Sequence, residues 1–460
     1  MLNWKWKMPL WKDFRANKKR RGECSFMLRK SLAALLVLVL LSALAVAPAF
    51  AEPAEGEKVT MNVMFQGGAT GADRPDFVMQ KLTERFPDIE FIPNIVMGDE
   101  SNYATKIRTL IAAGGEGLDV WWDRGGTWVM PVLAAKAALP LNEYLDKVPV
   151  FWDTVTKSAI KPHTDGNIYA IPCEEVFWEI IHYNKAIFDQ YNLEVPKTLD
   201  ELIEVCRVLK ENGVIPIVCS ALAGWPACMM VEGFAYTIDP EITKKIMNGE
   251  AKFSDEPYVE AAKAIKKLLD AGAFYENTPL CDEAEAQALF YSGKAAMWPN
   301  GSWALAPAYE NMDGNCDYFY YPAIRPEDVD EIGKTCSGGV KDNAGAMVYS
   351  GTKYPQLATE VAVAMSQSYQ QYLCEHDKSP FVVYDGEALG WDIPDFAPPS
   401  LRLVEDMGKF EFSYPFVQDV MPSAAAATML MDSTNKFFTN SSSYGVDEFI
   451  ADLDRSMLEK

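Results

Sequence analysis

The chain has 460 residues, of which 49% are hydrophobic, and it carries 42 Lys and Arg against 65 Asp and Glu, a formal net charge of −23. Nucleic acid is a poor partner for so acidic a surface, because the two would repel each other. The apolar content supports well-packed globular lobes and argues against a disordered chain.

The N-terminal segment is predicted to be a secretory signal peptide. Residues 31–51 form an apolar run that follows Arg29 and Lys30 and closes with Ala49-Phe50-Ala51, a small-residue cleavage signal. Met27 can open this signal by itself, so the basic stretch before it is interpreted as an over-extended start. The alternative is an uncleaved anchor helix, since about twenty apolar residues can span a bilayer. Pro48 and the A-x-A close argue against it.

Cleavage after Ala51 would leave 409 residues with 32 basic and 63 acidic side chains, a net charge of −31. That length exceeds the roughly 250 to 300 residues at which a single hydrophobic core stops growing. We therefore expect two lobes.

The first elements of this chain are predicted in strand–helix–strand order. Strands are expected at 59–65, 89–92 and 118–122, with helices at 77–86 and 103–113. The strand 118–122 delivers Asp123 and Arg124 at its C-terminal end. Ligands bind at that end of the strands in open α/β sheets.

The segment from Asp165 to Pro216 is the most informative part of the sequence. A strand ending at Pro172, an acidic and aromatic turn and a strand at 179–183 precede a helix. That helix begins with the capping box Thr198-x-x-Glu201, repeats apolar residues at helical spacing and stops at Asn212-Gly213. A further strand at 214–218 completes the pattern of an α/β domain.

Later elements continue this pattern. Helices are predicted at 258–269, closed by Gly272, and at 284–291. The sequence LFYSGKAAMWPNGSW follows at 289–303, and Ser337-Gly338-Gly339 precedes an apolar run at 344–349.

Several of these segments resemble one protein family. DGNIYAIP at 165–172, IHYNKAIF at 181–188 and PKTLDEL at 196–202 are similar to the sugar-binding, maltose-binding-like branch of the extracellular solute-binding proteins of ABC importers. ERFPDIEF at 84–91, ALPLNEYL at 138–145 and LFYSGKAAMWPNGSW resemble the same family, so the likeness covers nearly all of residues 58–460.

The resemblance implies an α/β, two-lobed periplasmic-binding-protein-like fold of type II. Each lobe is expected to hold a central β-sheet flanked by helices, with a ligand cleft between the lobes. The chain would cross between lobes near residues 173, 342 and 400. The N-terminal lobe would then comprise 58–173 plus 343–400, and the C-terminal lobe 174–342 plus 401–460.

The implied function is that of an exported receptor. It would bind a mono- or oligosaccharide between its lobes and deliver it to the membrane permease subunits of an ABC importer, as a monomer and without a metal or cofactor. Many relatives carry a lipid-modified Cys directly after the signal, whereas Glu52 stands there in this chain. We therefore expect a periplasmic or extracellular form without a lipid anchor.

A sugar ring offers an apolar C–H face and a rim of hydroxyl groups. A site for it needs flat aromatic side chains together with charged or amide groups. The candidate ligand-binding residues are Trp122, Asp123, Arg124, Glu174, Glu175, Trp178, Trp225, Trp303, Gly338 and Gly339. Gln66 and Trp391 are weaker candidates.

Each candidate also has a structural interpretation. Trp122, Asp123 and Arg124 match positions that contact sugar in maltose-binding relatives, although alternation places one Trp of the pair 121–122 in the core. The three candidates at 174–178 are alternatively hinge residues. Trp225 is predicted in a loop where relatives place a stacking aromatic, with core packing as the alternative.

Trp303 is the strongest candidate. Gly301 and Ser302 let the backbone approach closely, and the family motif often puts this Trp on the sugar face, with a core Trp at a helix start as the alternative. Gly338 and Gly339 would let backbone N–H groups approach ligand hydroxyls, or they are ordinary turn glycines.

Two other functions are alternatives. Asp123 with Glu174 or Glu175 would form the carboxylate pair of a glycoside hydrolase only at about 5 to 9.5 Å separation. No nucleophile elbow, zinc-binding helix or P-loop sequence occurs, so the chain is not expected to be an enzyme. Alternatively, clustered tryptophans would cage a cation such as a betaine or polyamine.

The cysteines give little information. Eight remain after the signal, with no C-x-x-C pair, and the three histidines lie far apart, so no zinc cluster is expected. Cys281 with Cys316 or Cys336 is a possible disulfide, but buried free thiols are the preferred interpretation.

Overall fold

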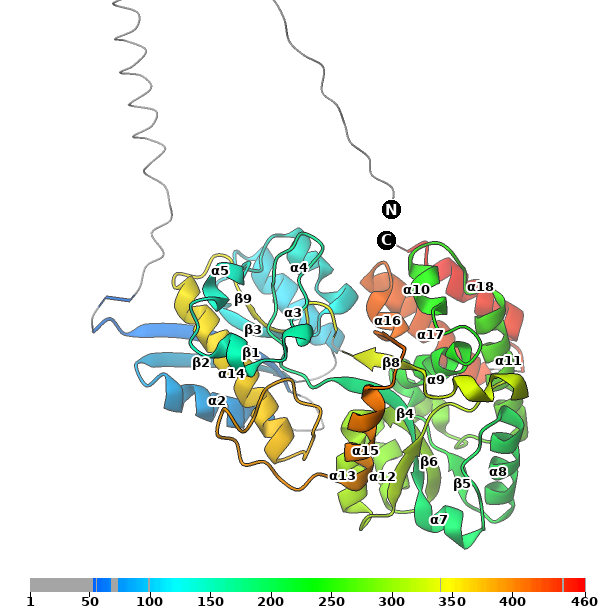
Figure 1. Cartoon of the computed structure of the whole chain (residues 1–460). Coiled ribbons are helices and arrows are strands. Elements are labelled where there is room, and N and C mark those ends of the chain that lie inside the picture. Colours follow the sequence, from blue (N-terminus) through cyan, green and yellow to red (C-terminus); the bar gives the residue numbers. More distant parts are fainter. Residues whose placement is uncertain are drawn as a thin grey trace, which may run out of the picture. The chain divides into compact units, whose positions relative to one another are not determined.

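The chain builds two β-sheets, each flanked by helices (Figure 1). This computed structural model describes residues 53–54, 56–67, 73–97, 100–339, 341–440 and 442–459. The predicted signal peptide and its cleavage site lie outside the described residues. No helix within the described ranges is long and apolar enough to cross a membrane.

The first sheet has the strand order β2-β1-β3-β9. Its strands are β1 (Val59–Gly67), β2 (Ile89–Met97), β3 (Val120–Asp123) and β9 (Gly345–Val348). β1 runs parallel to both neighbours, and β9 lies antiparallel to β3 with Val120 opposite Val348. All four residues of β3 are buried, as expected of a strand covered on both faces.

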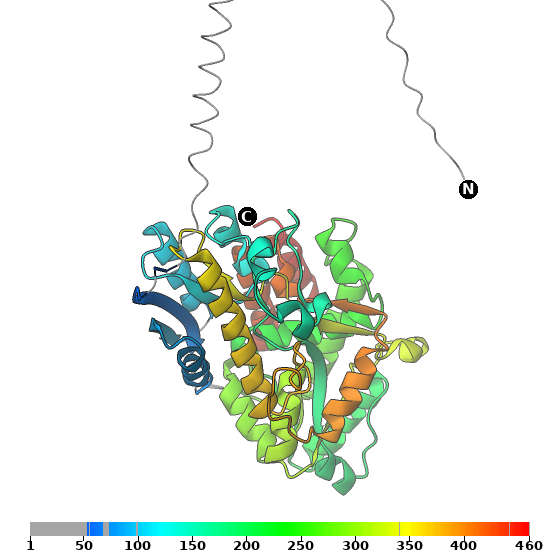
Figure 2. The ribbon, with the colours of Figure 1, turned by 60° about the vertical axis from the view of Figure 1, so that its left-hand side comes forward.

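The helices around this sheet are α2 (Arg74–Arg85), α3 (Glu100–Ala112), η1 (Gly126–Trp128), α4 (Met130–Ala134), α5 (Asn142–Leu145), α6 (Phe151–Thr154), η2 (Lys157–Ala159) and α14 (Pro355–Glu375). α14 is buried along most of its length and packs against α2 and β9, as Figure 2 shows for the gold and blue helices. α2 begins three residues earlier than predicted, because Pro75 fits the first helical turn, where its missing N–H is not needed.

The second sheet has the order β10-β8-β4-β6-β5, and β7 also pairs with β4. Its strands are β4 (Phe177–Asn184), β5 (Ile215–Ile217), β6 (Ala295–Gly301), β7 (Cys316–Phe319), β8 (Thr335–Gly339) and β10 (Phe412–Tyr414). The helices between β4 and β8 are α7 (Lys185–Gln190), α8 (Leu199–Glu211), η3 (Ala221–Ala223), α9 (Trp225–Tyr236), α10 (Ile242–Met247), α11 (Glu256–Ala271), η4 (Thr278–Leu280), α12 (Glu283–Tyr291), η5 (Ser302–Ala304), α13 (Leu305–Asn311) and η6 (Pro326–Glu331).

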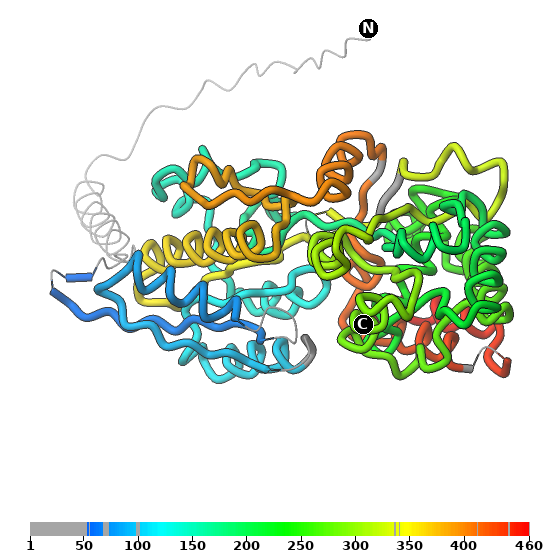
Figure 3. The backbone as a smooth tube through the Cα atoms, turned by 90° about the horizontal axis from the view of Figure 1, so that it is seen from below, coloured from blue at the N-terminus to red at the C-terminus, as the bar shows by residue number. Residues whose placement is uncertain are grey.

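The C-terminal helices also pack on the second sheet's side. They are α15 (Pro398–Met407), α16 (Val417–Val420), α17 (Ala424–Asn440) and α18 (Val446–Ser456). In Figure 3 the red end of the chain lies beside the green helices, in agreement with the contacts of α17 with α9 and of α18 with α11. Distant parts of the sequence therefore complete one layer of helices.

The capping box predicted for α8 is confirmed. Thr198 accepts a hydrogen bond from the backbone N–H of Glu201 at 3.3 Å, and the Glu201 carboxylate accepts one from the Thr198 N–H at 3.3 Å. The apolar residues at helical spacing, Cys206 among them, are buried against the second core.

Two extended segments connect the sheets and run antiparallel to each other. Ile171 forms a bridge with Ala346, and Phe177 and Trp178 pair with Gly339 and Gly338. A third connection, residues 376–397, leads from α14 to α15. The lobe limits given above stay a prediction.

One expectation from the sequence is wrong. The segment before Pro172 is not a strand: it makes only the isolated bridge at Ile171, and the Val348 carbonyl of β9 accepts a hydrogen bond from the Leu139 N–H at 2.8 Å instead of from this segment. The preferred interpretation of Cys281 and Cys316 as buried free thiols is confirmed, and the possible disulfide between them is not formed. The other described thiols, Cys173, Cys206, Cys219, Cys228 and Cys374, are free and buried too, and the side chain of Cys336 lies outside the described part.

We predict that Gly345→Ala lowers the free energy of unfolding by about 3 kcal/mol or more, because of steric overlap and backbone strain. A Cβ atom at Gly345 would lie 1.9 Å from the carbonyl oxygen of Ile171, and the backbone has a φ of +128°. Urea denaturation would measure the change. Gly213→Ala is the control: its φ is +75° with nothing within 4 Å of the added Cβ, so only about 1 kcal/mol is expected. Equal losses would contradict the argument.

Candidate functional site

Four aromatic side chains gather where the second sheet meets α9 and α16. The ring centroid of Trp303 lies 5.6 Å from that of Phe177, 5.8 Å from that of Trp225 and 6.4 Å from that of Phe416. Phe177 and Phe416 are buried, whereas both tryptophans are partly exposed. We call these four residues the aromatic cluster. Two predicted residues, Trp225 and Trp303, thus lie together, partly exposed and packed against the buried Phe177 and Phe416.

The local backbone fixes the position of Trp303. The ring folds back over Gly301, where an added Cβ would lie 2.1 Å from the indole. Ser302, the residue before it, accepts a hydrogen bond from the Trp178 N–H at 3.0 Å through its hydroxyl. Trp303 therefore lies in η5, directly after β6, with little freedom to turn away.

Trp225 was predicted to lie in a loop, and this prediction is wrong. It is the first residue of α9, and Pro226 occupies the first turn, where proline is tolerated. Gly224 lies against Met431 of α17, where an added Cβ would come within 2.7 Å of the side chain. The start of α9 is therefore packed close to α17.

The end of β3 supplies Trp122, Asp123 and Arg124. The Asp123 carboxylate accepts hydrogen bonds from the Trp121 indole N–H and the Gly125 N–H, each at 3.0 Å. Burial raises the pKa of Asp123 to about 6, against the lowering effect of those two donors. Trp122 packs against Tyr103 with ring centroids 5.6 Å apart, and both Trp121 and Trp122 are buried. Asp123 therefore shapes the loop that follows β3.

Arg124 reaches across to α16. Its Nη2 lies 3.6 Å from one carboxylate oxygen of Asp419, and the Nζ of Lys341 lies 3.3 Å from the other. The side chain of Asp419 is only 1% exposed. We call Arg124, Lys341 and Asp419 the ion cluster. Lys341 also lies over the Phe177 ring at 5.2 Å from its centroid, so the ion cluster adjoins the aromatic cluster.

Further contacts join η1 to α16 beside the ion cluster. The Thr127 hydroxyl donates a hydrogen bond to the Met421 carbonyl at 2.8 Å. Gln418 is 1% exposed, and neither polar atom of its side chain has a hydrogen-bond partner among the described residues. Since a buried amide without partners is costly, Gln418 is a candidate ligand-binding residue that sequence reasoning missed.

The candidates at the crossing have other partners. Glu175 is buried and accepts a hydrogen bond from the Ser379 hydroxyl, and the Glu174 carbonyl accepts one from Gln370 at 3.0 Å. Trp178 packs against Phe410 with ring centroids 5.7 Å apart. Alternation along β4 thus places Phe177, and not Trp178, beside Trp303.

The two predicted glycines belong to the crossing itself. Gly338 has a φ of +146°, and an added Cβ would lie 2.1 Å from the Phe177 carbonyl oxygen. Gly339 pairs with Phe177 in the same ladder. The backbone of these two glycines therefore lies close to β4. Of the weaker candidates, Gln66 is partly buried near the end of β1, and Trp391 packs 6.3 Å from Tyr384.

Comparison with known proteins identifies the family. A family model described as bacterial extracellular solute-binding protein matches residues 69–371. The chain belongs to this family. An ABC transporter extracellular-binding protein of Pyrococcus horikoshii, itself uncharacterized, is 25% identical over 263 residues, which span 55% of this chain and 58% of that protein. A multiple sugar-binding protein of Streptococcus mutans is 28% identical over 217 residues, or 44% of this chain and 49% of that protein. The chain thus spans about half the length of these relatives.

Solved structures share the fold of this solute-binding protein. A structure from work on xylan utilization by Caldanaerobius polysaccharolyticus superposes with a TM-score of 0.74 at 21% identity, covering 86% of this chain and 99% of that one. A chitin oligosaccharide binding protein gives a TM-score of 0.73 at 21% identity, covering 87% and 98%. A solute-binding protein in complex with raffinose gives 0.64 at 19% identity, covering 87% and 100%. The predicted two-lobed α/β fold is confirmed.

We predict that the unfolding free energy of the wild type falls as pH rises from about 5 to about 9, through Glu175. Burial, with the charge of Asp377 adding to it and Arg74 opposing, raises the pKa of Glu175 from its ordinary value of 4.5 to about 8. The folded state therefore holds this proton more tightly than the unfolded state. The stability from protonation is fully present below pH 4.5 and is lost as pH passes about 8.

Glu175→Gln should accordingly be more stable than the wild type at pH 9 by more than about 1 kcal/mol, with little difference at pH 5. Chemical denaturation at both pH values would measure this. The exposed substitution Glu204→Gln should show no such pH-dependent gain. A Glu175→Gln protein that is destabilised equally at both pH values would contradict the prediction.

A second prediction concerns the ion cluster. Asp419→Asn leaves two cationic groups without their buried partner, so the unfolding free energy should fall by about 3 kcal/mol. Asp270→Asn, which removes the exposed ion pair with Lys266 on α11, should cost less than about 1 kcal/mol. Thermal or urea unfolding of both variants would compare them, and similar losses would show that the buried contact contributes little.

Proposed function

We propose that this protein is the extracytoplasmic receptor of an ABC importer, binding a mono- or oligosaccharide between its lobes and delivering it to the membrane permease. The observation that carries the proposal is the pair Trp225 and Trp303, two partly exposed residues whose ring centroids lie 5.8 Å apart. Flat aromatic surface beside buried polar groups is the combination that a sugar requires.

The polar groups around the aromatic cluster suit hydroxyl groups. Gln418 offers an amide donor and an acceptor, and Arg124 and Lys341 bring N–H donors to the same region. Names of relatives and structural neighbours agree with this choice, since they include a multiple sugar-binding protein, a chitin oligosaccharide binding protein and a raffinose complex. We propose Trp225, Trp303, Phe177, Arg124 and Gln418 as the ligand-binding set.

The cationic alternative has less support than the carbohydrate proposal, because the names of the relatives and structural neighbours given above are those of sugar-binding proteins. The hydrolase alternative has less support, since Asp123 is engaged by Trp121 and Gly125, and Glu175 by Ser379.

Binding would be coupled to closure of the lobes. Residues of the first sheet's loops, Arg124 and Thr127, contact α16 on the other side. A ligand that touches both sides favours the closed state by its differential affinity. We infer that the permease recognises this closed form and that the receptor is exported, without a lipid anchor.

The test is tryptophan fluorescence of the purified protein, titrated with galactose, raffinose, stachyose, xylo-oligosaccharides and chito-oligosaccharides, with glycine betaine and spermidine beside them. We expect a saturable change with a sugar. Trp303→Ala should weaken the binding of that sugar by about fivefold or more, since one ring face contributes about 1 kcal/mol or more.

Trp152→Ala is the matched control. Trp152 lies on α6 and is partly exposed, and its indole N–H donates a hydrogen bond to the Asp146 carboxylate at 3.0 Å. It should leave the affinity unchanged. A response to betaine or spermidine with silence across the sugars would refute the carbohydrate proposal and keep the receptor fold.

A further inference from the structure

The carboxylate of Glu283 lies between the two segments that lead to Trp225 and Trp303. One of its oxygens accepts a hydrogen bond from the Ser220 hydroxyl and the other from the Asn300 side-chain amide, each at 2.5 Å. Both donor residues are fully buried. Ser220 comes five residues before Trp225 in the chain. Asn300 comes three residues before Trp303. One side chain of α12 is thus bonded to both segments.

The strands β5 and β6 bring these segments together. They are parallel, and their pairing extends to Ile217 of β5 opposite Met297 of β6. Ser220 lies three residues after Ile217, and Asn300 lies three residues after Met297. The two donors therefore follow the paired residues at the same interval. Beyond the ladder, the Glu283 carboxylate joins the two chains.

Asn300 connects Glu283 to the Trp303 ring. Its amide nitrogen donates to Glu283, and its side-chain oxygen accepts a hydrogen bond from the Gly301 N–H at 2.7 Å. A carboxylate only accepts hydrogen bonds from such an amide, so Glu283 fixes which way the Asn300 side chain is turned. The Trp303 ring folds over Gly301, where an added Cβ would lie 2.1 Å from the indole. Glu283 thus acts through Asn300 on the backbone beneath this ring.

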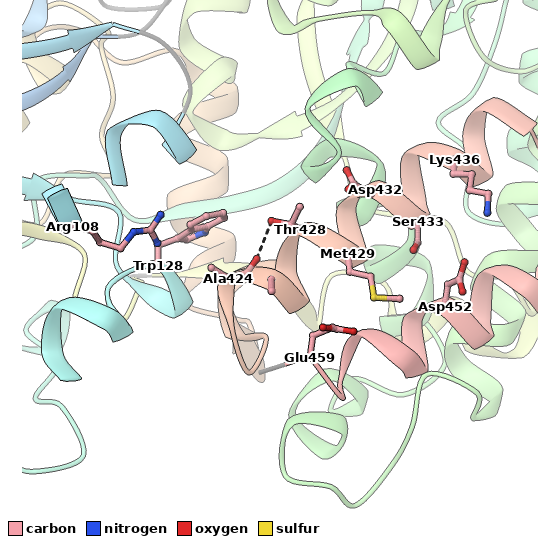
Figure 4. Close-up of a pocket in the computed structure, with 11 residues that line it drawn as sticks. Arg108, Trp128, Ala424, Thr428, Met429, Asp432, Ser433, Lys436, Asp452 and Glu459 are labelled. Atoms are coloured by element: carbon pink, nitrogen blue, oxygen red, sulfur yellow. Dashed lines mark hydrogen bonds between the residues drawn. The ribbon is translucent and has the colours of Figure 1, made fainter. Parts of the chain in front are cut away.

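The segment that leads to Trp225 has open space on its other side. Residues 222–224 line a cavity of about 440 Å³ along α17. This cavity shares lining residues with a larger one of about 610 Å³, which Figure 4 shows. Packing therefore leaves η3 room on the α17 side, and hydrogen bonds at its start hold it. The Asn435 amide donates to the Ala221 carbonyl at 2.6 Å, and Ser220 donates to Glu283.

The position of Glu283 in α12 favours its ionised form. It is the first residue of the helix, where the helix dipole stabilises negative charge. Asp282 caps the helix by accepting the Glu285 N–H at 2.8 Å, so the Glu283 carboxylate is left for its two partners. Burial raises the pKa of Glu283, and the hydrogen bonds from Ser220 and Asn300 oppose this rise. Both bonds are therefore charge-assisted, which makes them stronger than bonds between neutral groups.

We propose that Glu283 is a positioning residue that fixes the spacing of Trp225 and Trp303. Each of its two oxygens holds the segment that delivers one ring. The importance of this spacing for binding rests on the proposed sugar-binding function. Rings that are already held at the required spacing lose little freedom when a ligand binds, so this pre-organisation increases affinity.

The first test is ¹⁹F NMR of the purified, ligand-free protein labelled with 5-fluorotryptophan. Trp225→Phe and Trp303→Phe assign the two signals. Glu283→Ala should shift or broaden both and leave the remaining tryptophan signals in place. Glu283→Gln should keep both at their wild-type positions. Its amide oxygen can accept from Asn300 while its amide nitrogen donates to the Ser220 hydroxyl, so both contacts survive.

The second test is isothermal titration calorimetry of the same variants with galactose, raffinose, xylo-oligosaccharides and chito-oligosaccharides. For a sugar that binds the wild type, Glu283→Ala should weaken binding by about fivefold or more, and Glu283→Gln by less than about twofold. Glu285→Ala is the matched control. Glu285 is a partly exposed residue of the same helix and accepts a hydrogen bond from the Tyr275 hydroxyl at 3.0 Å. It should change neither the NMR signals nor the affinity.

Ser220→Ala removes one of the two bonds and decides the matter if Glu283→Ala does not fold. It should move the Trp225 signal more than the Trp303 signal. Unchanged signals of both rings in Ser220→Ala or Glu283→Ala would overturn the positioning role, and so would a Glu283→Gln protein that behaves as Glu283→Ala. If no sugar binds the wild type, the proposed function fails, while the NMR signals still decide whether Glu283 positions the two rings.

Discussion

The close pairing of the two crossing segments is the constraint on which the rest of the structure depends. Gly345 lies against the Ile171 carbonyl and Gly338 against the Phe177 carbonyl, at distances that leave no room for a side chain. The same two segments carry Phe177 and Lys341, which belong to the aromatic and ion clusters. The crossing segments and the two clusters thus share residues, so any change in the angle between the lobes would move both clusters directly.

The ion cluster joins the loop after β3 to α16. A buried carboxylate must lose its hydration, and Arg124 and Lys341 at 3.6 and 3.3 Å offset that cost. Such a contact is weaker than an apolar interface of the same size would be. Gln418, the residue before Asp419, has buried polar atoms without a hydrogen-bond partner among the described residues.

The sequence predicted the elements that depend on residues close together in the chain. The capping box of α8 and the buried strand ending at Asp123 were found because neighbouring residues decide them. Family motifs brought Trp225 and Trp303 to attention, and the structure places them together. Phe177 was missed because the predicted strand began at residue 179, whereas β4 begins at Phe177, and the partners of Asp419 were missed because they lie far from it in the chain.

One buried carboxyl group connects the crossing strand β8 with α16. Glu232 of α9 accepts hydrogen bonds from the hydroxyls of Tyr236, Thr243 and Ser337, and from the Val417 N–H at 3.1 Å. Ser337 precedes the crossing glycines, and Val417 precedes Gln418 and the ion cluster. Burial raises the pKa of Glu232 to about 7, although all four donors lower it. Burying an ionisable group costs free energy, so its four hydrogen bonds are best explained by the positions that they fix: they hold β8 and α16 at one distance, and the aromatic and ion clusters with them.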